Sequence, residues 1–159
     1  QGSRGPAAEQ LLRGRSAVCN CIELGIYSIY QTGQTGKWRN QKMTDVRQIL
    51  AEFQNGLGEL QKEVPGVVEA FIGIQDATFG DSAISNKTKE LISVAMGIEK
   101  RCKYCIVAHV YNAYEAGATR QEILEAAMVA MGGFGSGPSM AYSATLLLDA
   151  VNEFEKDFK

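Results

Sequence analysis

The residues best suited to carry chemistry lie in one segment, ELISVAMGIEKRCKYCIVAH, which runs from Glu90 to His109. The segment holds a C-x-x-C pair, Cys102 and Cys105, and the only histidine of the chain, with a glutamate twelve residues before the first cysteine. Two thiols at this spacing can form and reopen a disulfide, while an imidazole and a carboxylate can transfer protons. The segment therefore predicts a thiol redox site with its own proton relay.

A helix over about residues 102–116 would bring the two sulfurs and the imidazole together. Positions 102, 105 and 109 are spaced i, i+3 and i+7, so they share one face of that helix, and the Cα atoms of the cysteines are about 5 Å apart, within reach of a disulfide. Glu90 belongs to a preceding helix, predicted over 87–98 after a Ser85 cap. A sharp turn at 97–100 must bring Glu90 alongside His109, where it would orient the imidazole or hold a bridging water.

Two later segments extend the pattern that begins in this one. They are A-x-x-x-G-A-T-x-x-E-I-x-E-A, from Ala113 to Ala126, and GGFGSGPSMAY after it. With the Glu, C-x-x-C and His spacing, they make the chain from Met43 to its C-terminus resemble alkylhydroperoxidase D, within the carboxymuconolactone decarboxylase-like superfamily of small all-α oligomers. The resemblance implies one domain of about six helices over 43–159, assembled as a homotrimer or homohexamer.

The resemblance also implies a role for each residue of the predicted site. In that family the cysteine nearer the histidine attacks a peroxide, and the other cysteine resolves the product as an intramolecular disulfide. Carried over, Cys105 is peroxidatic, Cys102 is resolving, and His109 with Glu90 relays protons. The substrate is a peroxide or small disulfide, the reductant is an external dithiol or lipoyl-type group, and no flavin, haem or metal is required. One departure is Tyr104, because well-studied members have a histidine just before the second cysteine.

The assignment of the attacking thiol stays open on physical grounds. The amide groups and dipole of a helix N-terminus favour a thiolate, which points to Cys102 as the more N-terminal and better exposed sulfur. Proximity to His109 favours Cys105 instead, and we adopt Cys105.

Other readings of the cysteines and histidine compete with the redox site. Zinc is one, but Cys102 and His109 lie about 10.5 Å apart along a helix axis, too far to share a tetrahedral ion. A purely structural disulfide would close so small a loop that it restricts the unfolded chain little. The cysteines and histidine could also be inert packing, with Glu90 as a solvated helix residue.

Two other functional classes remain open beside a peroxidase or disulfide reductase. One is a decarboxylase or isomerase of small lactones that uses His109 and Glu90 for acid and base chemistry. Because the decarboxylase branch lacks the cysteine pair, this activity is less expected here. The other is a non-enzymatic redox-sensing module whose disulfide alters the contacts between subunits.

Composition limits the classes of partner. The 159 residues are 45% hydrophobic and 21% charged, with a net charge of −2, which suits one globular domain and argues against a nucleic-acid binder. No apolar run reaches the roughly 20 residues of a membrane span. A C-x-x-C pair beside a base is typical of the reducing cytoplasm, so we expect a cytoplasmic protein. Lys100, Arg101 and Lys103 could stabilise a thiolate or attract an acidic partner, or simply form a solvated turn.

Periodicity predicts helices through most of the chain. Apolar residues recur at helical spacing over about 44–62 and 65–79, the second opened by Pro65. Gly117 is expected to end the cysteine helix, and Thr119 with Glu122 forms a capping box for a helix over 120–131. A last helix is predicted over 138–157. The glycine run before it is expected to be a tightly packed hinge, not a dinucleotide site, with Phe134 and Ser136 lining a pocket.

The first 42 residues have little helical periodicity. We expect residues 1–42 to be an N-terminal extension, either non-native or unusual for the family. Cys19 and Cys21 lie in it without further ligand residues, so no role is assigned to them.

Overall fold

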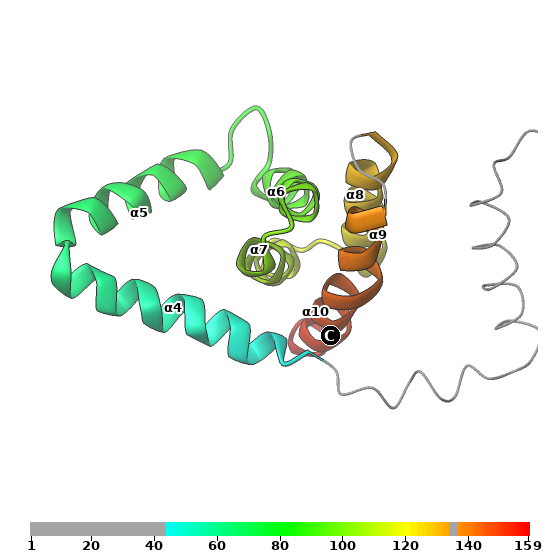
Figure 1. The fold of residues 1–159 in the computed structure, drawn as a ribbon. Coiled ribbons are helices and arrows are strands. Elements are labelled where there is room, and N and C mark those ends of the chain that lie inside the picture. Colours follow the sequence, from blue (N-terminus) through cyan, green and yellow to red (C-terminus); the bar gives the residue numbers. More distant parts are fainter. Residues whose placement is uncertain (1–43, 134–136) are drawn as a thin grey trace, which may run out of the picture. The chain divides into compact units, whose positions relative to one another are not determined.

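The structure, a computed structural model, describes residues 44–133 and 137–159, and within these residues it contains helices and no strands. The predicted all-α class is confirmed. The first described helix, α4 (Val46–Glu63), is capped by the Asp45 carboxylate, which accepts a hydrogen bond from the Gln48 amide. The next, α5 (Pro65–Phe79), begins at the predicted proline. Figure 1 shows these helices as a hairpin beside the remaining ones.

Three further helices hold the central part of the fold. They are α6 (Asn86–Lys100), α7 (Lys103–Glu115) and α8 (Arg120–Gly133). The predicted Ser85 cap is present, because its hydroxyl accepts from the Thr88 amide. Between α7 and α8, Gly117 adopts a φ of 80°, the left-handed conformation that a helix-ending glycine provides. The Thr119–Glu122 capping box also forms, with the Thr119 amide donating to Glu122 and the Glu122 amide to Thr119.

The predicted single helix over 138–157 is a broken run of helical segments. It consists of α9 (Gly137–Tyr142), a π-helical segment (Ser143–Leu147), α10 (Leu148–Phe154) and a final 3-10 turn (Glu155–Asp157). The Thr145 hydroxyl donates to the carbonyl of Ala141, the group that would accept from the Thr145 amide in a regular α-helix. This competition favours the wider turn.

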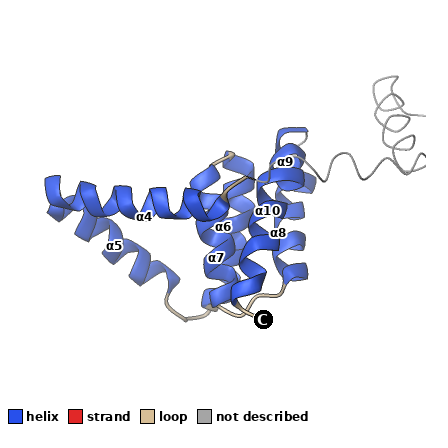
Figure 2. Ribbon diagram, turned by 90° about the horizontal axis from the view of Figure 1, so that it is seen from below, coloured by secondary structure: helices blue, strands red, loops and turns tan. Residues whose placement is uncertain are grey.

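The hydrophobic core lies among α6, α7, α8 and the C-terminal run, with the start of α4 packed against it. Figure 2 shows these helices grouped together, while α4 and α5 extend away from them. The fully buried side chains of largest volume include Phe154, Ile98, Ile106, Ile123 and Leu147. Val94 and Ile98 of α6 and Ile106 and Val110 of α7 are among its members, so the core joins the two helices that carry the predicted site.

The apolar face predicted for α4 and α5 is only partly buried. Val46 and Ile49 of α4 join the core, but Leu60 is 50% exposed, and in α5 only Val68 is buried while Ile74 is 63% exposed. We call the part from Phe53 to Phe79 the helical arm. Its apolar side chains follow the expected spacing, but the rest of the described chain leaves most of them exposed. None of the described helices combines the length and hydropathy that crossing a membrane requires.

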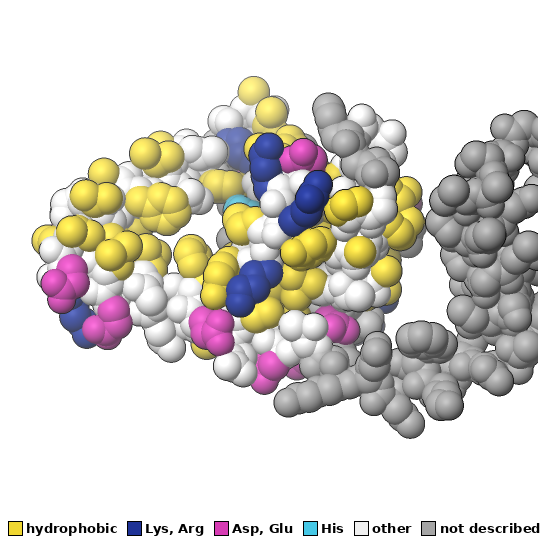
Figure 3. Space-filling view, in the orientation of Figure 1, with side chains coloured by type: hydrophobic (Ala, Val, Ile, Leu, Met, Phe, Trp, Pro, Cys, Tyr) yellow, Lys and Arg dark blue, Asp and Glu magenta, His cyan; other side chains and the backbone are white. Residues whose placement is uncertain are grey.

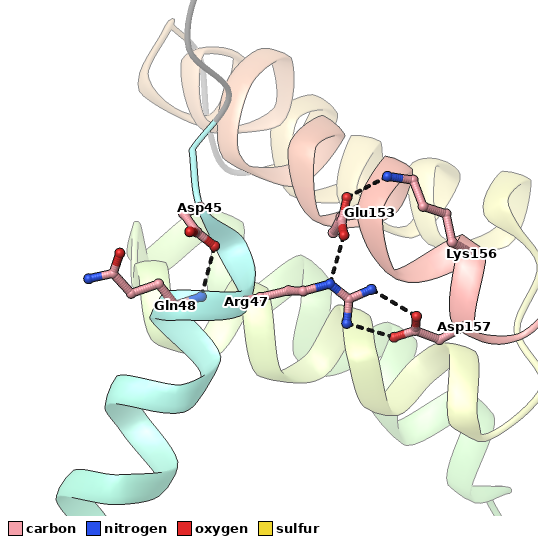
Figure 4. Close-up of polar contacts among 6 residues, drawn as sticks. All are labelled: Asp45, Arg47, Gln48, Glu153, Lys156 and Asp157. Atoms are coloured by element: carbon pink, nitrogen blue, oxygen red, sulfur yellow. Dashed lines mark hydrogen bonds and ion pairs between the residues drawn. The ribbon is translucent and has the colours of Figure 1, made fainter.

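A charged cluster ties the start of α4 to the C-terminus (Figure 4). The Arg47 Nε donates to Glu153 at 2.7 Å, and its two terminal nitrogens donate to the Asp157 carboxylate at 3.0 and 2.8 Å. Lys156 adds a second contact to Glu153 at 2.6 Å. Lys156 and Arg47 lower the pKa of Glu153, and Arg47 lowers the pKa of Asp157. The guanidinium also stacks over the ring of Phe154.

The cluster predicts how stability depends on pH. Carboxyl groups with lowered pKa values stabilise the fold above their unfolded pKa, near about 4, and lose that contribution as the pH falls through the folded pKa. The variant Arg47→Met keeps a long unbranched side chain but removes the charge. We expect its melting temperature to lie below that of the wild type at pH 7 and the difference to shrink as the pH falls below the unfolded pKa of about 4. Lys62→Met, at the exposed Lys62–Glu59 pair, is the control. A melting-temperature difference between Arg47→Met and the wild type that stays constant with pH would contradict a stabilising role for these ion pairs.

Candidate functional site

The site begins where α6 and α7 approach most closely, at Gly97. A Cβ atom on Gly97 would lie 3.2 Å from the amide nitrogen of Ile106 and 3.3 Å from its Cγ1 atom. The Gly97 carbonyl also accepts a hydrogen bond from the Cys102 amide at 3.1 Å. Helix α6 therefore continues through Gly97 to Lys100, and the sharp turn predicted at 97–100 lies instead at Arg101, which has a left-handed φ of 57°.

Gly97 gives a test of this close approach. Alanine normally stabilises a helix interior by up to about 1 kcal/mol relative to glycine, but a methyl group here would press on the backbone of α7, and overpacking costs about 1–3 kcal/mol. We expect Gly97→Ala to lower the free energy of unfolding by about 1 kcal/mol. Gly73→Ala in α5, where a Cβ atom has nothing within 4 Å, should raise it instead. Urea unfolding measures the free energy of unfolding of both variants. A change of the same sign in the two variants would contradict the close packing at Gly97.

The two cysteines form a disulfide at the first turn of α7. Their Cα atoms are 5.2 Å apart, and Cys102 is the N-cap residue of the helix, which therefore begins at Lys103, one position after the predicted start. The Cys105 amide donates to the Cys102 sulfur at 3.2 Å. Both side chains are half-buried. A sulfur at a helix N-cap that accepts a backbone hydrogen bond is well placed to carry negative charge when the disulfide opens.

The glutamate and the histidine meet across the two helices. His109 Nδ1 and Glu90 Oε2 are 2.7 Å apart, and Glu90 is buried, with 4% of its surface exposed. His109 lies on α7 one turn beyond Cys105, and Phe79 at the end of α5 stacks on its ring with the centroids 5.6 Å apart. The tertiary contact that the sequence required between Glu90 and His109 is thus present in the structure. Because Nδ1 is the ring nitrogen that contacts Glu90, Nε2 is the nitrogen that remains for proton transfer.

The sequence reading missed two residues beside this pair. Phe79 is the last residue of the helix predicted over 65–79, and nothing in its local sequence indicates that it reaches His109. Asn112 donates to Glu90 Oε1 at 3.4 Å. Its spacing of three residues from His109 on one helix is a signal that could have identified it. Both residues line a cavity of about 390 Å³ that also reaches Glu90, Asn86 and Gln75.

Tyr104, the departure from the family pattern, lies on the exposed side of the same turn. Its ring is 6.3 Å from that of Phe53 in α4, and the Lys103 ammonium lies 4.5 Å above it. Lys100 contacts Glu99. Figure 3 shows Lys and Arg side chains beside hydrophobic ones over the surface formed by α6 and α7. The remaining residues discussed from the sequence, Cys19, Cys21, Phe134 and Ser136, lie outside the described residues.

Comparisons with known proteins agree with the resemblance seen in the sequence. The family model of the carboxymuconolactone decarboxylase family matches residues 65–147. An uncharacterized protein of Cupriavidus necator is 34% identical over 111 residues, which are 69% of this chain and 97% of that protein. Another, encoded in the cox locus of Paracoccus denitrificans, is 38% identical over 74 residues, 46% of this chain and 67% of that protein.

Two solved structures are similar to the described fold. The crystal structure of an apo carboxymuconolactone decarboxylase family protein from Legionella pneumophila has a TM-score of 0.63 at 33% identity, covering 72% of this chain and 97% of that one. A Thermotoga maritima protein of the same family, for which a role in an antioxidative response has been suggested, has a TM-score of 0.57 at 23% identity, covering 69% and 96%. The sequence and fold together establish that this chain belongs to the carboxymuconolactone decarboxylase family.

Proposed function

We propose that the protein is a thiol-dependent peroxidase or disulfide reductase that works through Cys102 and Cys105. The observation that carries the proposal is the disulfide at the first turn of α7, one helical turn before His109, whose imidazole is hydrogen-bonded to the buried carboxylate of Glu90. A purely structural bridge needs no such pair, and a three-residue spacing restricts the unfolded chain little. The suggested antioxidative role of the Thermotoga maritima relative is consistent with this function.

The proposed cycle begins with the reduced protein. His109, oriented by Glu90, takes the proton of the Cys105 thiol, and the thiolate attacks the distal oxygen of a peroxide ROOH. The new S–O bond forms as the O–O bond breaks, and the leaving alkoxide takes the proton from His109 to become an alcohol. Cys105 is then a sulfenic acid. The Cys102 thiol condenses with it, so that an S–S bond forms and one water leaves.

An external dithiol closes the cycle by two exchange steps, in which it becomes a disulfide and returns both cysteines to thiols. A lipoyl-type group is the reductant that we propose. Lys100, Arg101 and Lys103 supply positive charge at the turn that carries the disulfide, which would attract an acidic carrier. Because the disulfide must be reduced by a thiol, we place the cycle in the cytoplasm.

We also propose that the chain assembles as a homotrimer or homohexamer. The helical arm and α8 leave large apolar side chains exposed, with Val67, Ile74 and Val129 each more than 60% accessible. A monomer would leave these groups in water, whereas self-association would bury them. Analytical ultracentrifugation of the reduced and oxidised protein measures the assembly state. A change in that state on oxidation without turnover would favour a redox-sensing module.

The function is tested by following peroxide-dependent oxidation of dihydrolipoamide by the wild-type protein. Turnover that consumes one dithiol per peroxide is the expected result. Lactone decarboxylation by the same preparation is the competing activity within the family, and it would persist without the cysteines because it needs only acid and base groups. Absence of dithiol oxidation with each of several peroxides and small disulfides would reject the proposal.

A further inference from the structure

The carboxylate of Glu90 has a separate partner for each of its oxygens. Oε2 contacts His109 Nδ1 at 2.7 Å, and Oε1 accepts from the Asn112 side chain at 3.4 Å. Both partners lie on α7, three residues apart, so they face the same group on α6. One face of α7 therefore supplies a hydrogen-bond partner for each oxygen of the carboxylate.

We infer that Asn112 is a positioning residue, which holds the Glu90 carboxylate in the orientation that presents Oε2 to His109. This inference rests on the proposed function, since it matters only if His109 transfers protons. Asn112 is not itself a catalytic residue, because its amide acts on Glu90 and not on the sulfurs or on a substrate.

The glutamate needs such a restraint because its terminal torsion is soft. Rotation about the last bond of a glutamate side chain has a broad, roughly two-fold profile, so the packing around the stem does not by itself fix the plane of the carboxylate. Burying a carboxylate oxygen without a hydrogen-bond partner also destabilises the folded protein. The amide of Asn112 satisfies Oε1 and fixes the plane in one contact.

The surroundings of Glu90 make the restraint more important. Two cavities, of about 390 and 260 Å³, are both lined by Asn86, Glu90 and Asn112. Asp76 of α5 lines the first and Glu115 of α7 lines the second, so the charged groups beside these spaces are acidic. With the amide removed, water in a cavity can draw Oε1 toward it, or repulsion from these carboxylates can rotate the group, and either motion turns Oε2 away from His109.

Two variants separate these effects. Asn112→Leu removes the donor and keeps the volume, whereas Asn112→Ala removes the donor and makes room for water, which can take over part of its role. We expect the kcat/KM for peroxide to fall by about 3- to 10-fold in Asn112→Leu, the size of one lost hydrogen bond, and by less in Asn112→Ala. The pH midpoint of cysteine alkylation in the reduced protein should rise in both variants, and the rise should be larger in Asn112→Leu than in Asn112→Ala.

Asn152→Leu, on the exposed face of α10, is the matched control and should leave both quantities unchanged. A role in stability alone would lower the melting temperature of the Asn112 variants and leave the alkylation midpoint where it is, which overturns the inference. Should Asn112→Leu not fold, Asn112→Ala provides the same readout. His109→Ala is measured in parallel. If it shifts the midpoint and the Asn112 variants do not, only the positioning role is rejected. If His109→Ala has no effect, the proposed relay is rejected first.

Discussion

Replacing Cys105 by serine is expected to reduce peroxide-dependent dithiol oxidation by at least about a thousand-fold, because no sulfenic acid can form on the serine oxygen. Cys102→Ser should behave differently. Its Cys105 can still attack one peroxide, so the first equivalent reacts and the protein then stops as a stable sulfenic acid. Mass spectrometry after one equivalent of peroxide, with a sulfenic-acid trap, distinguishes a single added oxygen from no reaction.

The comparison decides which sulfur attacks. Cys102 accepts a hydrogen bond from the Cys105 amide at the helix N-terminus, which stabilises its thiolate, whereas Cys105 is the cysteine one turn from His109. If Cys102 is the attacking residue, the trapped sulfenic acid appears in Cys105→Ser instead. A trapped product in both variants, or in neither, would contradict an ordered peroxidatic cycle.

The serine variants are suitable because they preserve the helix start. Serine is among the preferred N-cap residues, and its oxygen can accept the hydrogen bond that the Cys102 sulfur accepts from the Cys105 amide. The small loop closed by the disulfide contributes little to stability in the chain-entropy model. Loss of turnover with an unchanged melting temperature would therefore report on chemistry, and the double variant Cys102→Ser, Cys105→Ser supplies the baseline.

Helix positions could be predicted wherever a local signal fixes a helix end. Pro65, Ser85 and Gly117 each act through their own backbone or side chain within a few residues, and the structure places helix ends at all three. The π-helical segment could not be predicted, because the hydrogen bond from the Thr145 hydroxyl to the Ala141 carbonyl leaves the spacing of apolar residues in the sequence unchanged. The turn before Cys102 was placed too early, since Gly97 suggested a break where it in fact permits contact between helices.

The site was predictable as a set of residue types but not as a complete set of contacts. Glu90, Cys102, Cys105 and His109 were identified from chemistry and spacing, and the structure brings Glu90 to His109 and Cys102 to Cys105. Phe79 reaches His109 only because the C-terminal end of α5 returns to α7, which depends on tertiary packing. The exposure of the helical arm was unpredictable for a related reason. Periodicity shows which face of a helix is apolar, but not what covers it.

His109→Ala is expected to raise the pH at which cysteine alkylation is half-maximal by about one unit, because the thiolate loses an adjacent proton acceptor and the positive charge that this acceptor gains. Glu90→Gln should cause a smaller rise, since the amide can still contact Nδ1 but no longer carries the charge that stabilises a protonated imidazole. The measurement is the rate of iodoacetamide labelling of the reduced protein across the pH range, read at Cys105 by mass spectrometry.

Glu115→Gln is the matched control, because Glu115 lines the 260 Å³ cavity beside Glu90 and the same change of charge there does not alter the contact with His109. An effect of Glu115→Gln as large as that of Glu90→Gln would indicate a general field of the acidic surface in place of a specific relay. The relay requires in addition that Glu90→Gln in a His109→Ala background cause little further change, since the carboxylate acts through the imidazole. Additive shifts in the double variant would mean that the two groups act on the thiol independently.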